Sequence, residues 1–338
     1  MAPAPAEIYP DRDMNPDRNQ DMENINWVVA GVGDIARRRV IPAIQAERRS
    51  TLYGLVTRDA AKAGEYPGAK TWPTVEEAIQ DSAVDAVYIA LPVAMHADAA
   101  IAALRAGKHV LCEKPMAMNY AEAGCMLAEA EASGRVFGVS YYRRLYPKLL
   151  RAKQLITQGA IGQPVLVEAN CHSWLPAQDR GWLCEPALAG GGPLYDIASH
   201  RIDAMNFLFG KPEQALGLMS NALHKIRVED SATLLTRYAG GVHGVVDARW
   251  NSRISRDQFR VVGVEGEIGL DSLNGPELRV QGRVEMLPTH ANVHYPLVLN
   301  FAGAIAANSP GSVACTGEQA GWVDWVIDQV MRPRAGQF

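Results

Sequence analysis

Three side chains of this sequence have the chemistry to hold or move a proton. Lys114 closes a predicted strand that begins at His109, and Asp196 and His200 follow the triple glycine 190–192 at the start of a helical pattern. Residues four apart lie one above the other on a helix, so Asp196 and His200 are predicted to point the same way. A carboxylate beside an imidazole can orient the ring and hold its pKa where a proton is exchanged. A surface Lys-Pro turn and a buried histidine bonded to the main chain remain open as alternatives.

A glycine turn near the start of the chain predicts a dinucleotide site. The apolar run 27–30 breaks into G-x-G-x-x-A, and a helical pattern follows. In such a turn the first glycine takes a backbone conformation closed to other residues, the second lets the main chain approach a pyrophosphate, and the alanine lets the helix pack on the strand. The phosphate would lie on the helix N-terminus, where free N–H groups favour negative charge. The predicted cofactor contacts are Gly31, Gly33, Asp34, Ile35 and Ala36, although an ordinary strand-helix turn has the same spacing.

The end of the next predicted strand bears on which cofactor binds. In an NAD-binding unit an acidic residue near this point binds the ribose 2′-hydroxyl, whereas here the strand 52–57 ends in Thr57 and Arg58. A hydroxyl followed by a guanidinium suits a 2′-phosphate, because arginine binds phosphate through paired, charge-assisted hydrogen bonds. We therefore predict NADP. A shift of one or two residues would instead put Asp59 in the NAD-binding position.

From Trp27 onward, short apolar runs alternate with helical patterns, which predicts a parallel sheet wound with helices. Ligands of such sheets bind at the carboxyl ends of the strands. Two strand ends are informative, one after residues 84–91 and one after residues 109–112. The cofactor contacts predicted at these ends are Leu91, Pro92, His96, Glu113 and Lys114, and His96 could equally be structural because it begins a helix.

Composition narrows the class of protein. A net charge of −4 and a pI near 6.1 give no reason to expect nucleic acid, and no apolar run approaches the length of about 18 residues needed to cross a membrane. The five cysteines are scattered, which is typical of reduced thiols in a cytoplasmic protein. No metal site is predicted, since His290 and His294, the nearest approach to ligand spacing, are expected in a solvated loop. Residues 1–24 are expected to be a disordered arm.

Four features in this order resemble the Gfo/Idh/MocA oxidoreductases, which include glucose-fructose oxidoreductase and inositol dehydrogenases. They are the turn Gly31 to Ala36; the string A-G-K-H-V-L-C-E-K-P at 106–115; the triple glycine with Asp196 and His200; and a strand-rich C-terminal half. The string at 106–115 is specific. The sequence is identified as a member of this family over roughly residues 25 to 330.

The resemblance implies an α/β fold in two parts. An N-terminal Rossmann dinucleotide-binding domain would span residues 25–145. A C-terminal α+β domain with a large, mostly antiparallel open sheet would span 146–338 and hold the substrate. At the crossover the family places an arginine near the cofactor, which we assign to Arg144, with Arg143 as the alternative. The sheet would also pair with a second copy, giving a dimer or tetramer.

The resemblance further implies hydride transfer between a nicotinamide, of NADP or else NAD, and a sugar, polyol or related small molecule. His200 would be the general acid or base on the substrate oxygen, Lys114 would stabilise charge on that oxygen, and Asp196 would fix His200 or a neighbouring hydroxyl. Two alternatives stay open. One is an NAD-dependent glycosidase, an activity that some members of this family have. The other is a dinucleotide-binding sensor that has lost the chemistry. Relatives similar to 1,5-anhydrofructose reductase often have arginine where Leu183 stands here, which weakens that particular activity.

Overall fold

The computed structural model describes residues 24–175 and 178–332, so most of the predicted N-terminal arm lies outside the described residues. The first half is built on a parallel sheet with strand order β3-β2-β1-β4-β5-β6. Its strands are β1 (Ile25–Ala30), β2 (Ser50–Val56), β3 (Lys70–Trp72), β4 (Ala86–Ile89), β5 (His109–Cys112) and β6 (Phe137–Val139). This order has the topological switch between β1 and β4, where doubly wound sheets bind ligands.

Both faces of this sheet are buried, which explains why its strands are apolar at nearly every position. Along β1, Val28 and Ala30 belong to one buried cluster, and Trp27 and Val29 belong to another. The helical segments of this half are η2 (Ala36–Val40), α2 (Ile41–Ala46), α3 (Ala60–Gly64), α4 (Val75–Ala78), η3 (Val93–Met95), α5 (His96–Arg105) and α6 (Tyr120–Ser133). The helix predicted after the glycine turn is confirmed, with a π-helical stretch at η2.

The second half is built on an eight-stranded sheet with the order β14-β13-β12-β11-β7-β10-β9-β8. Its strands are β7 (Pro164–Trp174), β8 (Pro212–Ser220), β9 (Ser231–Tyr238), β10 (His243–Arg249), β11 (Asn251–Gly263), β12 (Gly266–Gly269), β13 (Glu277–Val280) and β14 (Arg283–Met286). All pairs are antiparallel except β7 with β10. The predicted fold class, a Rossmann unit followed by an α+β unit with a mostly antiparallel sheet, is confirmed.

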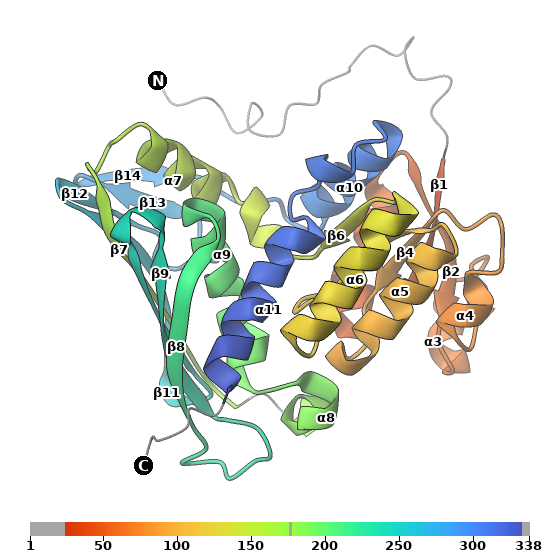
Figure 1. Cartoon of the computed structure of the whole chain (residues 1–338). Coiled ribbons are helices and arrows are strands. Elements are labelled where there is room, and N and C mark those ends of the chain that lie inside the picture. The colour runs from red at the N-terminus through yellow and green to blue at the C-terminus, as the bar shows by residue number, and fades with distance from the viewer. Residues whose placement is uncertain (1–23, 176–177, 333–338) are drawn as a thin grey trace.

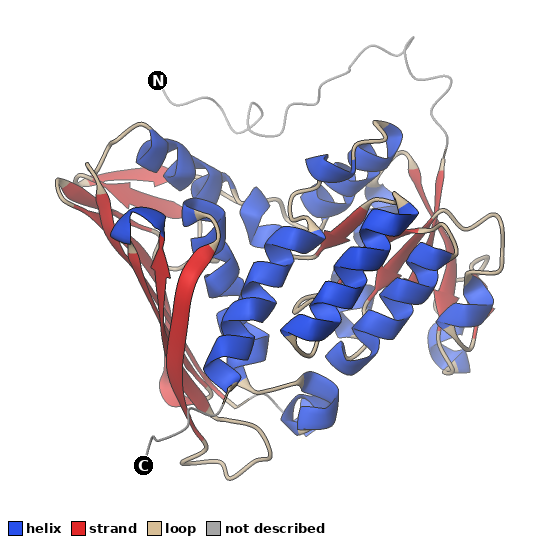
Figure 2. Ribbon diagram, viewed as in Figure 1, coloured by secondary structure: helices blue, strands red, loops and turns tan. Residues whose placement is uncertain are grey.

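Helices cover one face of the second sheet, and Figure 2 shows no helix against its outer face. The helical segments from the crossover onward are η4 (Tyr142–Leu145), α7 (Pro147–Thr157), η5 (Gln178–Cys184), α8 (Pro186–Ala189), η6 (Leu194–Ala198), α9 (Ser199–Phe209), η7 (Ala239–Gly241), α10 (Tyr295–Ala306), η8 (Pro310–Ser312) and α11 (Gly317–Met331). Helices α7, α9 and α11 contact the sheet through β13, β10 and β8 respectively (Figure 1).

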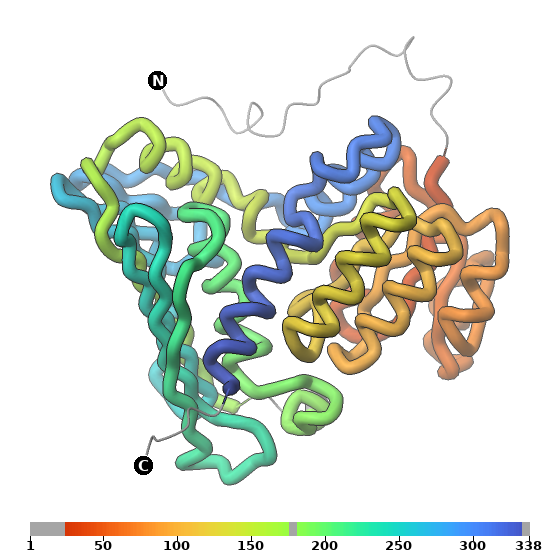
Figure 3. The backbone as a smooth tube through the Cα atoms, viewed as in Figure 1, coloured from red at the N-terminus to blue at the C-terminus, as the bar shows by residue number. Residues whose placement is uncertain are grey.

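The end of the chain returns to the first half. Helix α10 packs on α2, and the ring of Phe301 lies 5.4 Å from that of Trp27 in β1. Helix α11 lies between the two halves, where it contacts α6 on one side and α9 on the other (Figure 3). Residues 295–306, expected within the second domain, therefore pack on the Rossmann core. Within the described ranges, no helix is both long and apolar enough to cross a membrane.

Candidate functional site

The glycine turn has the open main chain that a pyrophosphate needs. Gly31 has φ +94°, and a Cβ added there would stand 2.5 Å from the carbonyl oxygen of Ala90, so only glycine fits. A Cβ added to Gly33 would meet nothing within 4 Å, so its backbone faces open space. Ala36 is fully buried against the sheet, while Ile35 is 38 % exposed beside the turn. The residues present therefore fit a dinucleotide phosphate at this helix N-terminus.

Arg58 and Asp59, the two residues predicted to select the cofactor at the end of β2, have different surroundings. Asp59 caps α3, since Oδ1 accepts hydrogen bonds from the N–H groups of Ala61 (3.0 Å) and Lys62 (3.4 Å). Thr57 Oγ1 accepts a hydrogen bond from the main-chain N–H of Asp59. The exposed Arg58 makes no hydrogen bond or ion pair with the residues that the structure describes. Its guanidinium is therefore available for an external anion, whereas the carboxylate of Asp59 is engaged locally.

His96 lies behind the two predicted cofactor loops and not on their ligand side. The ring is 1 % exposed, and its Nε2 and Nδ1 atoms lie 2.9 Å from the carbonyl oxygens of Leu91 and Pro115, respectively. It joins the loop after β4 to the loop after β5, which contains Lys114. The structure therefore replaces the predicted cofactor contact of His96 with a structural role, the alternative that its helix-start position had left open.

Lys114 and Asp196 meet across the two halves of the molecule. Lys114 Nζ donates to the carbonyl oxygen of Asp196 at 2.7 Å and lies 3.2 Å from its Oδ1 atom. The two side chains are 15 % and 26 % exposed, so the pair is accessible at one side. The main-chain contact fixes the height of the ammonium group over the end of β5, and the carboxylate holds its charge in place.

No hydrogen bond joins Asp196 to His200 in the described part of the chain, so the expectation that Asp196 orients the imidazole is not met. Residues 194–198 form a π-helical turn in which the N–H of Ser199 bonds to the carbonyl oxygen of Leu194, five residues earlier. The wider turn changes the angle between positions four apart, which an α-helical spacing rule assumes to be aligned. The Asp196 carboxylate therefore pairs with the ammonium group of Lys114.

The imidazole of His200 is buried against aromatic rings. It is 6 % exposed, its Nδ1 atom has no hydrogen-bond partner in the described structure, and its ring centroid lies 5.9 Å from Tyr141 and 5.3 Å from Tyr142. Burial lowers the pKa of His200 well below its ordinary value, and the charges of Arg143 and Lys114 lower it further. A neutral imidazole at neutral pH is a proton acceptor.

The triple glycine allows close packing beneath this site. A Cβ at Gly190 or Gly191 would stand within 2.5 Å of the Tyr195 ring, and one at Gly192 would be 2.1 Å from the carbonyl oxygen of Glu229. Glu229 Oε1 accepts hydrogen bonds from the N–H of Gly192 (2.9 Å) and of Leu194 (3.0 Å). The glycines thus let the start of η6 approach the 229 main chain, and this approach positions Asp196.

The two crossover arginines have different environments. Arg144 is 2 % exposed and binds the buried carboxylate of Asp203 through Nη2 (2.7 Å) and Nε (2.9 Å), with a further bond to Gln319. Its guanidinium is therefore engaged inside the protein, which disfavours the predicted cofactor contact. Arg143, the alternative weighed for this crossover, instead lines a pocket of about 490 Å³ that also includes Ile35 of the glycine turn.

Sequence reasoning missed one pair beside this pocket. His294 is 1 % exposed, its Nε2 atom lies 3.4 Å from Oε1 of Glu113, and its ring is 4.7 Å from Tyr142. Burial alone would raise the pKa of Glu113, but His294 and the hydroxyl of Tyr88, which donates to Oε1 at 2.7 Å, hold it at about 2. The expectation of a solvated loop at His294 was wrong, because a contact between residues so far apart in the chain leaves no local sequence signal.

Comparison with known proteins agrees with this architecture. Residues 25–141 match the oxidoreductase family model described as an NAD-binding Rossmann fold, and residues 149–269 match the GFO/IDH/MocA C-terminal domain. The 1,5-anhydro-D-fructose reductase of Ensifer adhaerens is 32 % identical over 308 residues, which are 88 % of this chain and 92 % of that protein.

Two solved structures share the fold over most of both chains. The aldose-aldose oxidoreductase of Caulobacter crescentus, complexed with glycerol, is 25 % identical with a TM-score of 0.81, covering 90 % of this chain and 96 % of that one. A levoglucosan dehydrogenase, complexed with NADH and levoglucosan, is 24 % identical with a TM-score of 0.83, covering 91 % and 96 %. The family models match both halves of the chain in order, and a relative is 32 % identical over 88 % of it. The chain therefore belongs to the GFO/IDH/MocA oxidoreductase family.

Proposed function

We propose that this protein is an NADP-dependent oxidoreductase that transfers a hydride between the nicotinamide and a hydroxyl- or carbonyl-bearing carbon of a sugar, polyol or related small molecule. The observation that carries the proposal is that Lys114 is paired with Asp196 and its charge acts on the buried imidazole of His200. One pocket also joins Ile35 of the glycine turn to Tyr142, whose ring lies beside His200. The names of two similar proteins, an anhydrofructose reductase and an aldose-aldose oxidoreductase, support a carbohydrate substrate.

Each residue has one task in this proposal. In the direction of alcohol oxidation, His200 accepts the proton of the substrate hydroxyl, for which its depressed pKa keeps it neutral. Lys114 donates a hydrogen bond to the same oxygen and stabilises its developing negative charge. Asp196 holds the Lys114 ammonium group in position. The bound nicotinamide supplies or accepts the hydride, and Gly33 with the helix N-terminus would hold its pyrophosphate.

Arg58 supports NADP over NAD. A 2′-phosphate needs a cation at the end of β2, and Arg58 is exposed there with its charge unpaired by the described residues. Asp59, the residue that would favour NAD, uses its carboxylate to cap α3. The matched test compares the dissociation constants of NADPH and NADH in the wild type, Arg58→Ala and Asp59→Ala. We expect preference for NADPH, lost only in Arg58→Ala; preference for NADH that survives this substitution would assign NAD.

The activity itself is tested by following nicotinamide absorbance with a panel of sugars and polyols in both directions. Lys114→Met and His200→Ala should each lower kcat by about 100-fold or more, the usual contribution of a placed acid or base. Binding of NADPH, measured separately, should change little in His200→Ala. Turnover that is unchanged in both variants would remove these residues from the chemistry. Product formation without any net change in absorbance would instead favour the NAD-dependent glycosidase.

Leu183 bears on the substrate, because arginine is the residue expected at this position in a 1,5-anhydrofructose reductase. The side chain is 7 % exposed and packs in a small buried cluster with Val228 and Trp250. An apolar residue in that environment offers no charge to a cofactor or substrate. We therefore propose a substrate other than 1,5-anhydrofructose within the same sugar class.

The outer face of the second sheet supports a homo-oligomer. Leu216 and Leu235 are directly opposite each other on β8 and β9, and Leu218 is two residues along β8; all three are exposed by more than a third. We propose that this face pairs with a second copy to form a dimer or tetramer. Leu218→Asp should lower the mass measured by light scattering. All five cysteines are free thiols, which supports a cytoplasmic location.

A further inference from the structure

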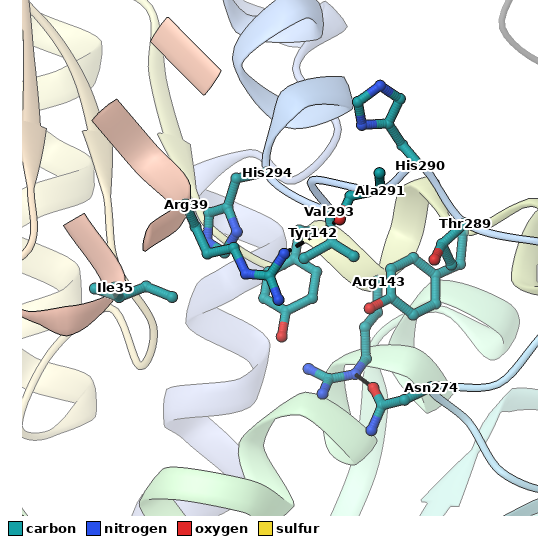
Figure 4. Close-up of a pocket in the computed structure, with 11 residues that line it drawn as sticks. Ile35, Arg39, Tyr142, Arg143, Asn274, Thr289, His290, Ala291, Val293 and His294 are labelled. Carbon is teal, nitrogen blue, oxygen red and sulfur yellow. Dashed lines mark hydrogen bonds between the residues drawn. The ribbon is translucent and has the colours of Figure 1, made fainter. Parts of the chain in front are cut away.

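The pocket between the two halves has positively charged side chains and no acidic side chain among its described lining residues. It is lined by Arg39 from η2, by Tyr142 and Arg143 from η4, by Asn274, and by Thr289, His290, Ala291, Val293 and His294 before α10 (Figure 4). Its volume of about 490 Å³ is large enough for a small sugar. None of its described lining residues is acidic, and the nearby carboxylate of Glu113 lies against the lining residue His294, so an anion entering the pocket meets two guanidinium groups first.

Arg143 is a buried cation without an ion-pair partner among the described residues, although its charge acts on the buried carboxylate of Asp203. It is 7 % exposed, and its Nη1 atom is buried without a hydrogen-bond partner. Nε donates to Oδ1 of Asn274 at 3.1 Å, and the guanidinium lies over the Tyr142 ring at 4.9 Å. Removing a charge from water without a partner is costly, so a site of this kind is completed by an external anion.

Asn274 separates Arg143 from the nearby acidic group. The side chain of Asn274 donates to Oδ2 of Asp257 at 3.0 Å, and Asp257 is ion-paired with Arg201 at 2.6 Å. The carboxylate of Asp257 therefore neutralises Arg201, and the group that accepts a hydrogen bond from Arg143 is the amide oxygen of Asn274. This arrangement holds the guanidinium in a fixed place while leaving one of its donors free.

The anion site adjoins the reacting centre. Tyr142 lines the pocket and also lies beside the reacting centre. Its ring centroid is 5.3 Å from that of His200 and 4.7 Å from that of His294. The charge of Arg143 is the largest electrostatic influence on His200 after burial. The cofactor pyrophosphate is expected at the helix N-terminus by Gly33, so the anion on Arg143 belongs to the molecule whose carbon reacts.

We propose that the substrate is a sugar acid, an aldonic or uronic acid whose carboxylate binds Arg143 while a hydroxyl faces Lys114 and His200. The inference rests on the proposed oxidoreductase function and names its substrate class. A carboxylate, with one negative charge and planar geometry, matches one desolvated guanidinium. A phosphate ester would bring nearly twice that charge to a site with a single buried cation.

The test uses the cofactor-loaded enzyme and matched pairs of substrates that differ only in the anion. Glucuronate with glucose and galacturonate with galactose are two such pairs, and glucose 6-phosphate is the phosphate comparison. Dissociation constants from calorimetry are read beside kcat/KM, so that binding is measured even without turnover. We expect at least one sugar acid to be preferred over its neutral partner by about 100-fold in kcat/KM and in affinity.

Two variants test whether the preference comes from Arg143. In Arg143→Gln the ratio of acid to neutral sugar should fall by at least about tenfold, and Arg143→Lys should restore only part of it because lysine lacks the bidentate fork. The exposed Arg279→Gln on β13 is the matched control and should keep the preference.

Three results would overturn the inference. If neutral sugars bind and react as well as their acids, the inference is wrong but the proposed oxidoreductase function stands. A preference for the phosphate ester would have the same consequence. NADPH affinity that falls tenfold in Arg143→Gln with unchanged acid selectivity would assign the guanidinium to the cofactor. If no sugar of either kind reacts and no acid binds, the proposed function fails together with the inference.

Discussion

Replacing Arg144 should lower the unfolding free energy of the protein and leave its affinity for the cofactor unchanged. Its guanidinium and the Asp203 carboxylate are 2 % and 1 % exposed and joined at 2.7 and 2.9 Å. In Arg144→Met the carboxylate stays buried, and its remaining described contact is the thiol of Cys315 at 3.9 Å. Breaking one side of a buried pair costs about 3–5 kcal/mol of unfolding free energy. With about 2.1 cal/mol/K of unfolding entropy per residue, this lowers the midpoint by about 4–7 °C in a chain of this length.

The assay is chemical denaturation followed by circular dichroism, with NADPH affinity measured on the folded variant. The neighbouring substitution Arg143→Met is the matched control, because Arg143 has no ion-pair partner in the described structure and its removal strands no buried carboxylate, so it should not lower the unfolding free energy. The double variant Arg144→Met with Asp203→Leu should regain most of the stability, since an apolar pair no longer strands a charge. Native stability with weakened NADPH binding in Arg144→Met would refute this account and return the residue to the cofactor site.

Three further outcomes follow from the site. Because the folded pKa of His200 is depressed, its native neutral form stabilises the protein fully above pH 6.5, and this contribution is lost as the pH falls through the folded pKa; the stability difference between wild type and His200→Asn should therefore change below pH 6.5 and be flat above it. Gly33→Ala should raise the dissociation constant of NADPH with little loss of stability, whereas Gly192→Ala should destabilise the fold because of its contact with Glu229, and equal thermal shifts in the two would contradict this. Asp196→Asn should lower kcat by loosening Lys114 and leave the pH profile assigned to His200 unmoved, so a shifted profile would show a direct link between the two.

The sequence by itself determined the periodic parts of this protein. The apolar strands at 52–57, 84–91 and 109–112, the G-x-G-x-x-A turn and the helix that follows it were predicted within a few residues of their observed bounds. These features depend on local chemistry, namely glycine conformation, alternating burial and helix capping. The candidate residues Lys114, Asp196 and His200 were also found from their position in motifs.

Only the tertiary structure decided which candidates act on each other. A π-helical turn gave Asp196 to Lys114 and not to His200, and a carboxylate at Asp203, far along the chain, engages Arg144 in a buried ion pair. His294 reached Glu113 across an even longer separation. Sequence spacing carries no information about such contacts, because charge partners are chosen by packing in three dimensions, where burial makes an unpaired ion costly and so fixes which pairs form.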